Sequence, residues 1–162
     1  MTNQLTILQN NIKTCAFTGH RLLEEDFSLK QLKKVIKEVI LRGVDTFYVG
    51  MAMGFDLYAA ETVLSLQKKY KNIKLIACIP CYNQEKNFSS ADKKRYTKIL
   101  KKVDEQVLVS ENYYNGCMQK RDIYMADRAD ILIAYLKKDT GGTAFTVKYF
   151  QKKYPLKEKI FI

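Results

Sequence analysis

The sequence predicts an α/β fold: a single Rossmann-like, three-layer αβα domain with a mostly parallel sheet. Two observations carry this prediction. Short runs of β-type residues alternate with stretches of helical period, and glycine-bearing turns follow several of the predicted strands. The chain has 162 residues, 47% of them hydrophobic, which is enough for one hydrophobic core. We expect residues 1–12 to form an N-terminal extension and residues 13–162 to form the domain.

The predicted order of elements is βαβαβαβαβαβ, and its first strand covers residues 14–18. The clearest helix follows, because Ser28 and Gln31 have capping-box spacing, an apolar face recurs from Leu29 to Ile40, and Gly43 ends the pattern. The other elements are expected as strands at 46–49, 73–79, 106–109, 130–135 and 159–162, and as helices at 55–69, 90–102, 116–128 and 143–152.

The charge is strongly basic, with 28 Lys and Arg against 17 Asp and Glu, for a formal net charge of +11. Basic residues gather in segments 86–102 and 148–159. Such stripes bind nucleic acid or attract anionic ligands, and they also occur as plain solvated surfaces. The chain has no apolar run long enough for a bilayer, and residues 1–11 lack a secretory pattern. We therefore expect a cytoplasmic protein without membrane contact.

The four cysteines are Cys15, Cys78, Cys81 and Cys117. In a reducing compartment such residues act as small apolar side chains, so we expect no disulfide. Cys78 and Cys81 have C-x-x-C spacing, but the pair ends a predicted strand and no second ligand pair follows at a suitable distance. No metal site is expected.

Three glycine-bearing turns each lie between a predicted strand and a predicted helix, at residues 18–21, 50–56 and 140–143. The carboxyl ends of parallel strands meet at one sheet edge, where open α/β sheets bind ligands. Glycine allows the backbone to approach a ligand, and the N-terminus of the following helix favours an anion. The 50–56 turn is neither a dinucleotide fingerprint nor a P-loop. The three turns together predict a nucleotide site.

Charged side chains beside these turns have alternative interpretations. Arg21 can direct two N–H donors at a phosphate, or it can pair with the acids at 24–26. Arg121 could reach the same anion. Asp56 can cap a helix, bind ribose hydroxyls or transfer a proton, whereas Glu61 is a surface or packing residue unless it faces the cleft. His20 is the only histidine, with no located partner.

Several motifs in order carry a resemblance to a known family: residues 18–21, 50–56, 80–84 with Phe88, 118–122 and 141–146. Together they resemble the YpsA family (DUF1273) of the SLOG superfamily, whose relatives include DprA and the LOG phosphoribohydrolases. The resemblance covers Lys13 to the C-terminus. It implies a Rossmann-like fold, a nucleotide-derived ligand such as NAD, ADP-ribose or a cyclic nucleotide, and a homodimer. No cofactor beyond this ligand is expected.

The motifs and turns together define the expected ligand-binding residues: Thr18, Gly19, His20, Arg21, Gly50, Met51, Gly54, Phe55, Asp56, Pro80, Tyr82, Gln84, Asn115, Arg121, Gly141, Gly142 and Thr143. Two departures from the family alter one wall of the site, since Cys81 stands where Phe is common and Phe88 where Trp is common. The 141–146 segment also lacks the proline, last glycine and glutamate of the phosphoribohydrolase motif.

Three functions follow as hypotheses. The first is a binding domain that senses or sequesters a nucleotide-derived molecule. The second is an N-glycosidic-bond hydrolase in which Arg21 binds phosphate and Asp56 or Glu61 supplies the catalytic acid. The third is DprA-like DNA binding through the lysines of segment 93–102. We rank it below the other two, so a small molecule is the favoured partner and nucleic acid the less favoured one.

Overall fold

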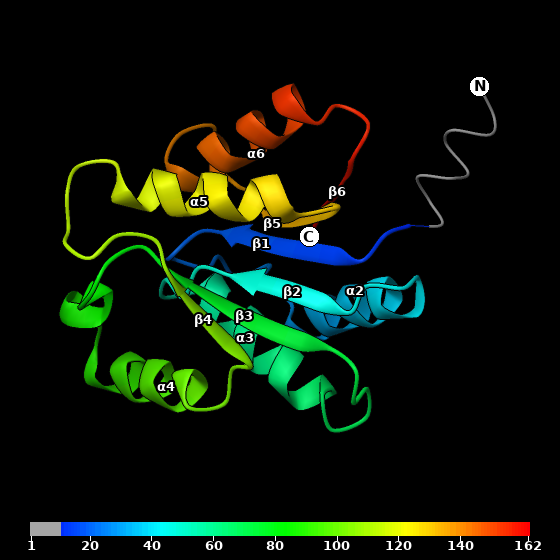
Figure 1. The fold of residues 1–162 in the computed structure, drawn as a ribbon, viewed down its shortest axis with the longest axis horizontal. Coiled ribbons are helices and arrows are strands. Elements are labelled where there is room, and N and C mark those ends of the chain that lie inside the picture. Colours follow the sequence, from blue (N-terminus) through cyan, green and yellow to red (C-terminus); the bar gives the residue numbers. More distant parts are fainter. Residues whose placement is uncertain (1–10) are drawn as a thin grey trace.

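A six-stranded, fully parallel sheet forms the middle layer of the protein (Figure 1). The structure is a computed structural model that describes residues 11–162. All but the last two residues of the predicted extension, 1–12, lie outside this range. The sheet order is β4-β3-β2-β1-β5-β6. The strands are β1 (Thr14–Gly19), β2 (Thr46–Val49), β3 (Lys74–Ile79), β4 (Glu105–Leu108), β5 (Ile131–Tyr135) and β6 (Glu158–Phe161).

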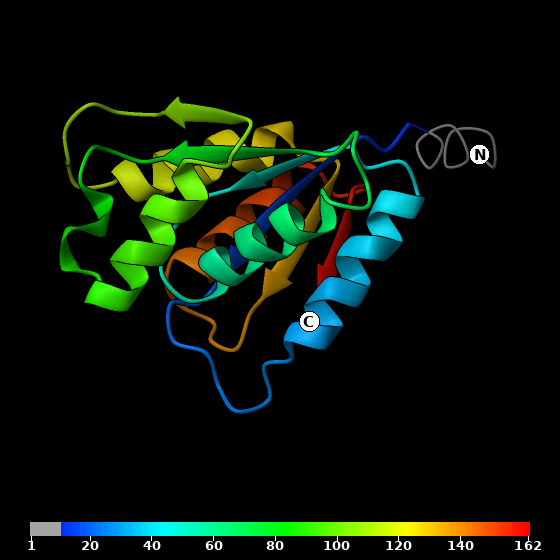
Figure 2. The same ribbon diagram turned by 90° about the horizontal axis from the view of Figure 1, so that it is seen from below.

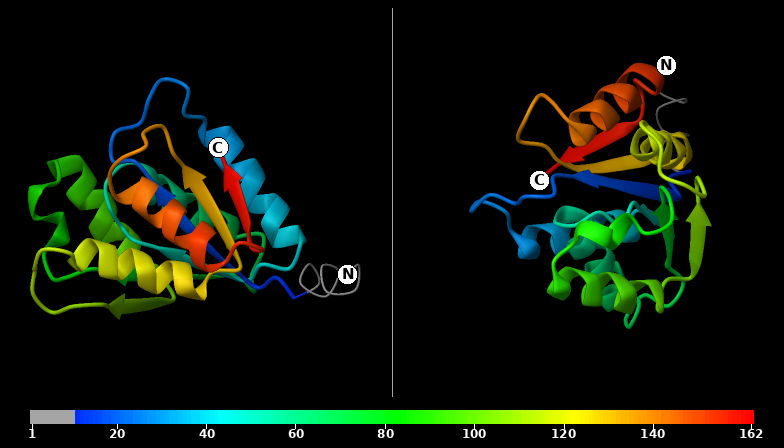
Figure 3. Two further views of the ribbon diagram at one scale, coloured as in Figure 1. Left: turned by 90° about the horizontal axis from the view of Figure 1, so that it is seen from above. Right: turned by 90° about the vertical axis from the view of Figure 1, so that its left-hand side faces the viewer.

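Helices cover both faces of this sheet. One face carries α2 (Leu29–Leu41), α3 (Phe55–Leu66) and α4 (Ser90–Leu100), which lie in front of the sheet in Figure 2. The other face carries α5 (Cys117–Arg128) and α6 (Gly142–Lys153), and Figure 3 shows the two helical layers on either side of the strands. The predicted three-layer α/β fold is confirmed, with every neighbouring strand pair parallel.

The strand order reverses direction between β1 and β5. From β1 the chain adds β2, β3 and β4 outward on one side, then crosses back to place β5 against β1. The register pairs Phe17 with Ile133 and Gly19 with Tyr135, so the two strands end level with each other. Ligands of open α/β sheets bind at such a reversal, where the following loops diverge to opposite faces.

The clearest predicted helix shows how the sequence positions an element. The Ser28 hydroxyl accepts a hydrogen bond from the Gln31 backbone N–H at 3.1 Å, which confirms the expected N-cap. Along α2, Leu32, Ile36 and Val39 are fully buried against the sheet. Leu29 is 49% exposed, so the apolar face begins one turn later than the sequence predicts.

Differences from the predicted elements are confined to their ends and one short insertion. The helices predicted at 55–69 and 90–102 end earlier, at Leu66 and Leu100. A 3-10 helix, η1 (Gln84–Asn87), lies in a segment expected to be loop. Among residues 11–162, none of the helices has the length and apolar character needed to cross a bilayer.

We predict that replacing Leu32 with alanine will lower the free energy of unfolding by about 2–5 kcal/mol, because it removes buried methyl groups and leaves a cavity. Urea denaturation followed by circular dichroism measures this. The matched control is Leu41→Ala on the same helix, where the side chain is 76% exposed and the change should stay within about 0.5 kcal/mol. Equal losses in the two variants would contradict the packing of α2.

Candidate functional site

A pocket of about 420 Å³ opens where β1 and β5 end. Residues from all three predicted turns line it, so the turns converge at one sheet edge as the strand order requires. The start of α5 closes the remaining side. Its lining residues are Phe17, Thr18, Gly19, His20, Arg21, Leu22, Ala52, Asp56, Met118, Arg121, Asp122, Met125, Lys138, Thr140, Gly141, Gly142 and Thr143.

The N-terminus of α6 faces this pocket. Its N-cap is Gly141, with φ of 92°, and no side chain caps the first turn. Gly142 and Thr143 follow and also line the pocket. An uncapped helix start presents backbone N–H groups and a partial positive charge, which suits an anion. The α3 N-terminus differs, because the Phe55 N–H donates to the His20 carbonyl at 3.2 Å.

Arg121 lies at the back of the pocket with only 5% of its surface exposed. Its Nη1 donates to the Gly50 carbonyl, and its Nε donates to Asp122 Oδ1 at 2.7 Å. A Cβ atom at position 50 would lie 2.7 Å from Nη1, so the close approach of the guanidinium requires glycine there. Two donors of Arg121 are therefore directed at the protein itself, and the residue connects α5 to the turn after β2.

Asp56 is the buried carboxylate of the pocket, with 6% of its surface exposed. Its Oδ2 accepts a hydrogen bond from the Ala52 N–H at 3.2 Å, while Oδ1 has no partner among the described residues. Burial raises the pKa of Asp56 to about 7, although the Arg121 charge acts in the opposite direction. Near neutral pH this carboxyl can both donate and accept a hydrogen bond.

Gly54 precedes α3, the helix that carries Asp56, and packs closely against the chain after β1. Gly54 has φ of 78°, and a Cβ atom there would overlap the Arg21 carbonyl. The segment between the glycines also includes Met51 with φ of 62°, which is unfavourable for a side-chain-bearing residue. A strained, tightly packed turn thus connects β2 to α3 directly behind the pocket.

Arg21 lies exposed at the rim of the pocket. The sequence left open an ion pair with the acids at 24–26, but within residues 11–162 Asp26 pairs with Lys137 and Arg21 forms no ion pair. Lys138 lines the same pocket from the β5–α6 loop. Two cationic side chains therefore lie beside the α6 N-terminus.

His20 connects two of the loops around the pocket. Its Nε2 accepts hydrogen bonds from the N–H groups of Lys137, at 2.8 Å, and Lys138, at 3.3 Å. Partial burial lowers the pKa of His20 below its ordinary value, with Lys138 acting in the same direction. The imidazole is therefore neutral at pH 7 and acts as an acceptor that fixes the β5–α6 loop.

Several predicted ligand residues do not line the pocket. Met51 and Phe55 are fully buried in the hydrophobic core. The structure places Glu61 on the exposed side of α3, where it pairs with Arg95. Gln84 donates to the Gly50 carbonyl at 3.2 Å and so supports the turn from outside. The predicted loop residues outside the lining are Gly50, Gly54, Pro80, Tyr82 and Asn115.

Lys138, Ala52 and Asp122 line the pocket without having been predicted as ligand residues. Asp122 belongs to the 118–122 motif, which was a usable signal, whereas Lys138 is one lysine among many. Burial raises the pKa of Asp122, and its Arg121 partner opposes this. Across residues 11–162 no group of three His, Cys, Asp or Glu side chains is arranged to hold a metal ion.

A known family model matches most of the chain. The model described as the YspA SLOG family (YpsA) matches residues 23–161. The chain belongs to this YpsA family. UPF0398 protein YpsA of Bacillus subtilis (strain 168) is 25% identical over 155 residues, covering 88% of this chain and 86% of the relative. SPbeta prophage-derived protein YoqJ of the same strain is 31% identical over 137 residues, covering 76% and 80%.

Two solved structures of DNA processing protein A (DprA) share the fold. The Streptococcus pneumoniae protein superposes with a TM-score of 0.65 at 17% identity, over 94% of this chain and 51% of DprA. The Helicobacter pylori protein, described by its single-stranded DNA binding mode, gives 0.68 at 18% identity, over 96% of this chain and 67% of DprA. This YpsA-family chain thus spans about half of the S. pneumoniae protein.

We predict that the stability difference between the wild type and Asp56→Asn depends on pH. The folded-state pKa is raised, so folded Asp56 keeps a proton that the unfolded chain has released. The wild type therefore loses stability relative to Asp56→Asn as pH rises, by about 3 kcal/mol between about pH 5 and about pH 8. Urea denaturation across this range measures the difference.

The control for this pH dependence is Asp139→Asn, whose carboxyl is 91% exposed and pairs with Lys148 on the surface. Its difference from the wild type should stay flat over the same range. If the free energies of unfolding of Asp56→Asn and the wild type also differ by a constant amount from about pH 5 to about pH 8, Asp56 does not titrate near neutral pH.

Proposed function

We propose that the pocket between β1 and β5 binds a small nucleotide-derived molecule, which the protein senses or sequesters. One observation carries the proposal: the unpartnered, buried Oδ1 of Asp56 shares a pocket with the uncapped N-terminus of α6. The first group needs a hydrogen-bonding partner and the second favours an anion. A ribose phosphate supplies both.

The phosphate is assigned to the α6 end of the pocket. Backbone N–H groups at Gly142 and Thr143 would donate to its oxygens. Arg21 at the rim adds a two-pronged donor, and Lys138 adds a point charge. Together they balance the charge of a phosphate monoester or diester without a metal ion.

The sugar is assigned to Asp56. A ribose hydroxyl both donates and accepts, so it can pair with the carboxyl in either protonation state. Buried groups of this kind gain most from a partner, because the unpaired state costs about 1–3 kcal/mol. The volume of about 420 Å³ falls within the usual range of small-molecule sites, roughly 300–1,000 Å³.

Hydrolysis of an N-glycosidic bond is the alternative for the same pocket. The observation that favours it is the pKa of Asp56, about 7, which suits a general acid at neutral pH. Glu61 lies outside the pocket lining, so Asp56 would act as the acid. Single-stranded DNA, which the H. pylori DprA binds, is a third candidate partner, which would use the lysines of segment 93–102.

We predict that AMP or ADP-ribose raises the melting temperature of the wild type, whereas adenosine, which lacks the phosphate, raises it less. Arg21→Ala should weaken phosphate-ligand binding about 10-fold or more, because it removes a charge-assisted hydrogen bond. The matched control is Arg42→Ala, an exposed arginine paired with Glu158 at the opposite end of the sheet. Equal affinity of Arg21→Ala and the wild type would contradict the phosphate assignment.

Chromatography of each mixture after incubation separates binding from hydrolysis. We expect the ligand to be recovered intact. Release of free base by the wild type and not by Asp56→Asn would replace the binding function with the hydrolase. Stabilisation by oligo-dT, with none by AMP or ADP-ribose, would favour the DNA-binding alternative.

A further inference from the structure

A second cavity lies between α3 and α4, on the face of the sheet that α2, α3 and α4 cover. Its volume is about 610 Å³, and it shares no lining residue with the pocket between β1 and β5. We call it the basic groove. Its lining residues are Glu61, Leu64, Ser65, Gln67, Lys68, Lys71, Arg95, Lys98, Ile99 and Lys102.

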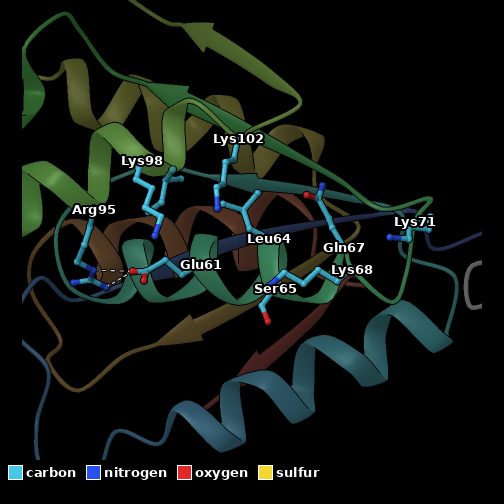
Figure 4. A pocket seen from close by; sticks show the side chains of 10 residues that line it. Glu61, Leu64, Ser65, Gln67, Lys68, Lys71, Arg95, Lys98 and Lys102 are labelled. Carbon is cyan, nitrogen blue, oxygen red and sulfur yellow. Dashed lines mark hydrogen bonds and ion pairs between the residues drawn. The ribbon is translucent and has the colours of Figure 1, made fainter.

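Lysines stand on both walls of the basic groove. Lys98 lies on α4 and Lys102 follows one turn later, and Figure 4 shows both projecting toward α3. Lys68 and Lys71 follow the end of α3 and border the opposite wall. The four-residue spacing of Lys98 and Lys102 places them on the same side of the end of α4. Lys68 and Lys71 lie in the turns after α3. The groove is therefore edged by two short rows of positive charge.

The only acid in the lining is already neutralised. Arg95 Nε donates to Glu61 Oε1 at 2.8 Å, and its Nη1 donates to Asp92 at 3.0 Å. The same guanidinium lies 4.5 Å from the centre of the Tyr58 ring, which fixes it further. The ion pair lies at one end of the set of lining residues, as Figure 4 shows. Within residues 11–162 the four lysines of the walls form no ion pair.

The floor between the lysine rows is apolar. Leu64 is partly buried and supplies the accessible apolar surface, while Ile99 beneath it is 2% exposed and belongs to the main hydrophobic core. The aliphatic stems of the lysines extend this apolar surface while their ammonium groups reach water. An occupant must therefore bring apolar groups to the floor and negative charge to both rims.

We propose that the basic groove docks an acidic, amphipathic helical segment of a partner protein. Such a segment places an apolar stripe on Leu64 and the lysine stems, and carboxylates beside the lysines on either side. Charge complementarity of this kind steers association and sets the orientation of the partner. Single-stranded DNA fits less well, because its bases stack on aromatic side chains and the lining has none.

The test is selection of binders from a random 16-residue peptide library displayed on phage, with the full protein as target. We expect the enriched sequences to be acidic, with apolar residues at helical spacing. Fluorescence polarisation of an enriched peptide should then show at least 10-fold weaker binding to the double variant Lys98→Glu/Lys102→Glu. Circular dichroism and thermal melting establish that the variant is folded.

The matched control is Lys30→Glu/Lys34→Glu, which makes the same charge change on the exposed side of α2 and should leave peptide affinity within about 2-fold of the wild type. A scrambled peptide of equal composition should bind at least 10-fold more weakly. Equal binding of the scrambled peptide, no enrichment of acidic sequences, or equal losses in the two double variants would overturn the proposal. Tighter binding of oligo-dT, lost on reversal of Lys98 and Lys102, would assign the groove to nucleic acid instead.

Discussion

The buried guanidinium of Arg121 is the interaction on which the site depends. It extends from α5 to the Gly50 carbonyl at the end of β2 and pairs with Asp122 beside it. Removing a charge from water is costly, so such a group is stable only when its partners are well placed. Gly50 leaves the space for it, and Gln84 donates to the same carbonyl from the outer side. One cation therefore joins the start of α5 to the turn that follows β2.

The charge of Arg121 also influences the pKa of Asp56 in the pocket. Burial favours the neutral form of Asp56 and the Arg121 charge favours the ionised form, and the balance lies near neutral pH. Met51 and Gly54, both with positive φ, lie in the turn that precedes Asp56. The basic groove lies further along the helix that carries Asp56, between α3 and α4, and carries its charge at the surface.

Much of this arrangement could be predicted from the sequence. Alternating patterns gave the elements, and the rule for carboxyl ends of parallel strands brought residues 18–21 and 140–143 to one edge. The sequence could not predict which side of α3 faces the sheet and which faces solvent. Most of that helix is buried, and its pattern has no clear polar side. From the sequence alone, Glu61 is therefore a candidate catalytic acid. The structure shows instead that it pairs with Arg95 outside the pocket lining. Likewise, nothing in the sequence distinguishes the lysines that border the groove from their solvated neighbours.

The most direct measurement is a ¹H–¹⁵N NMR titration of the protein with AMP. Binding at the reversal between β1 and β5 predicts saturable shifts of the Gly142 and Thr143 amides, with those of Arg21 and Asp56 moving at the same ligand concentration. Amides of α3 and α4 beside the basic groove should stay in place. Shifts confined to the groove, or no saturable shift at the start of α6, would contradict a phosphate site in this pocket.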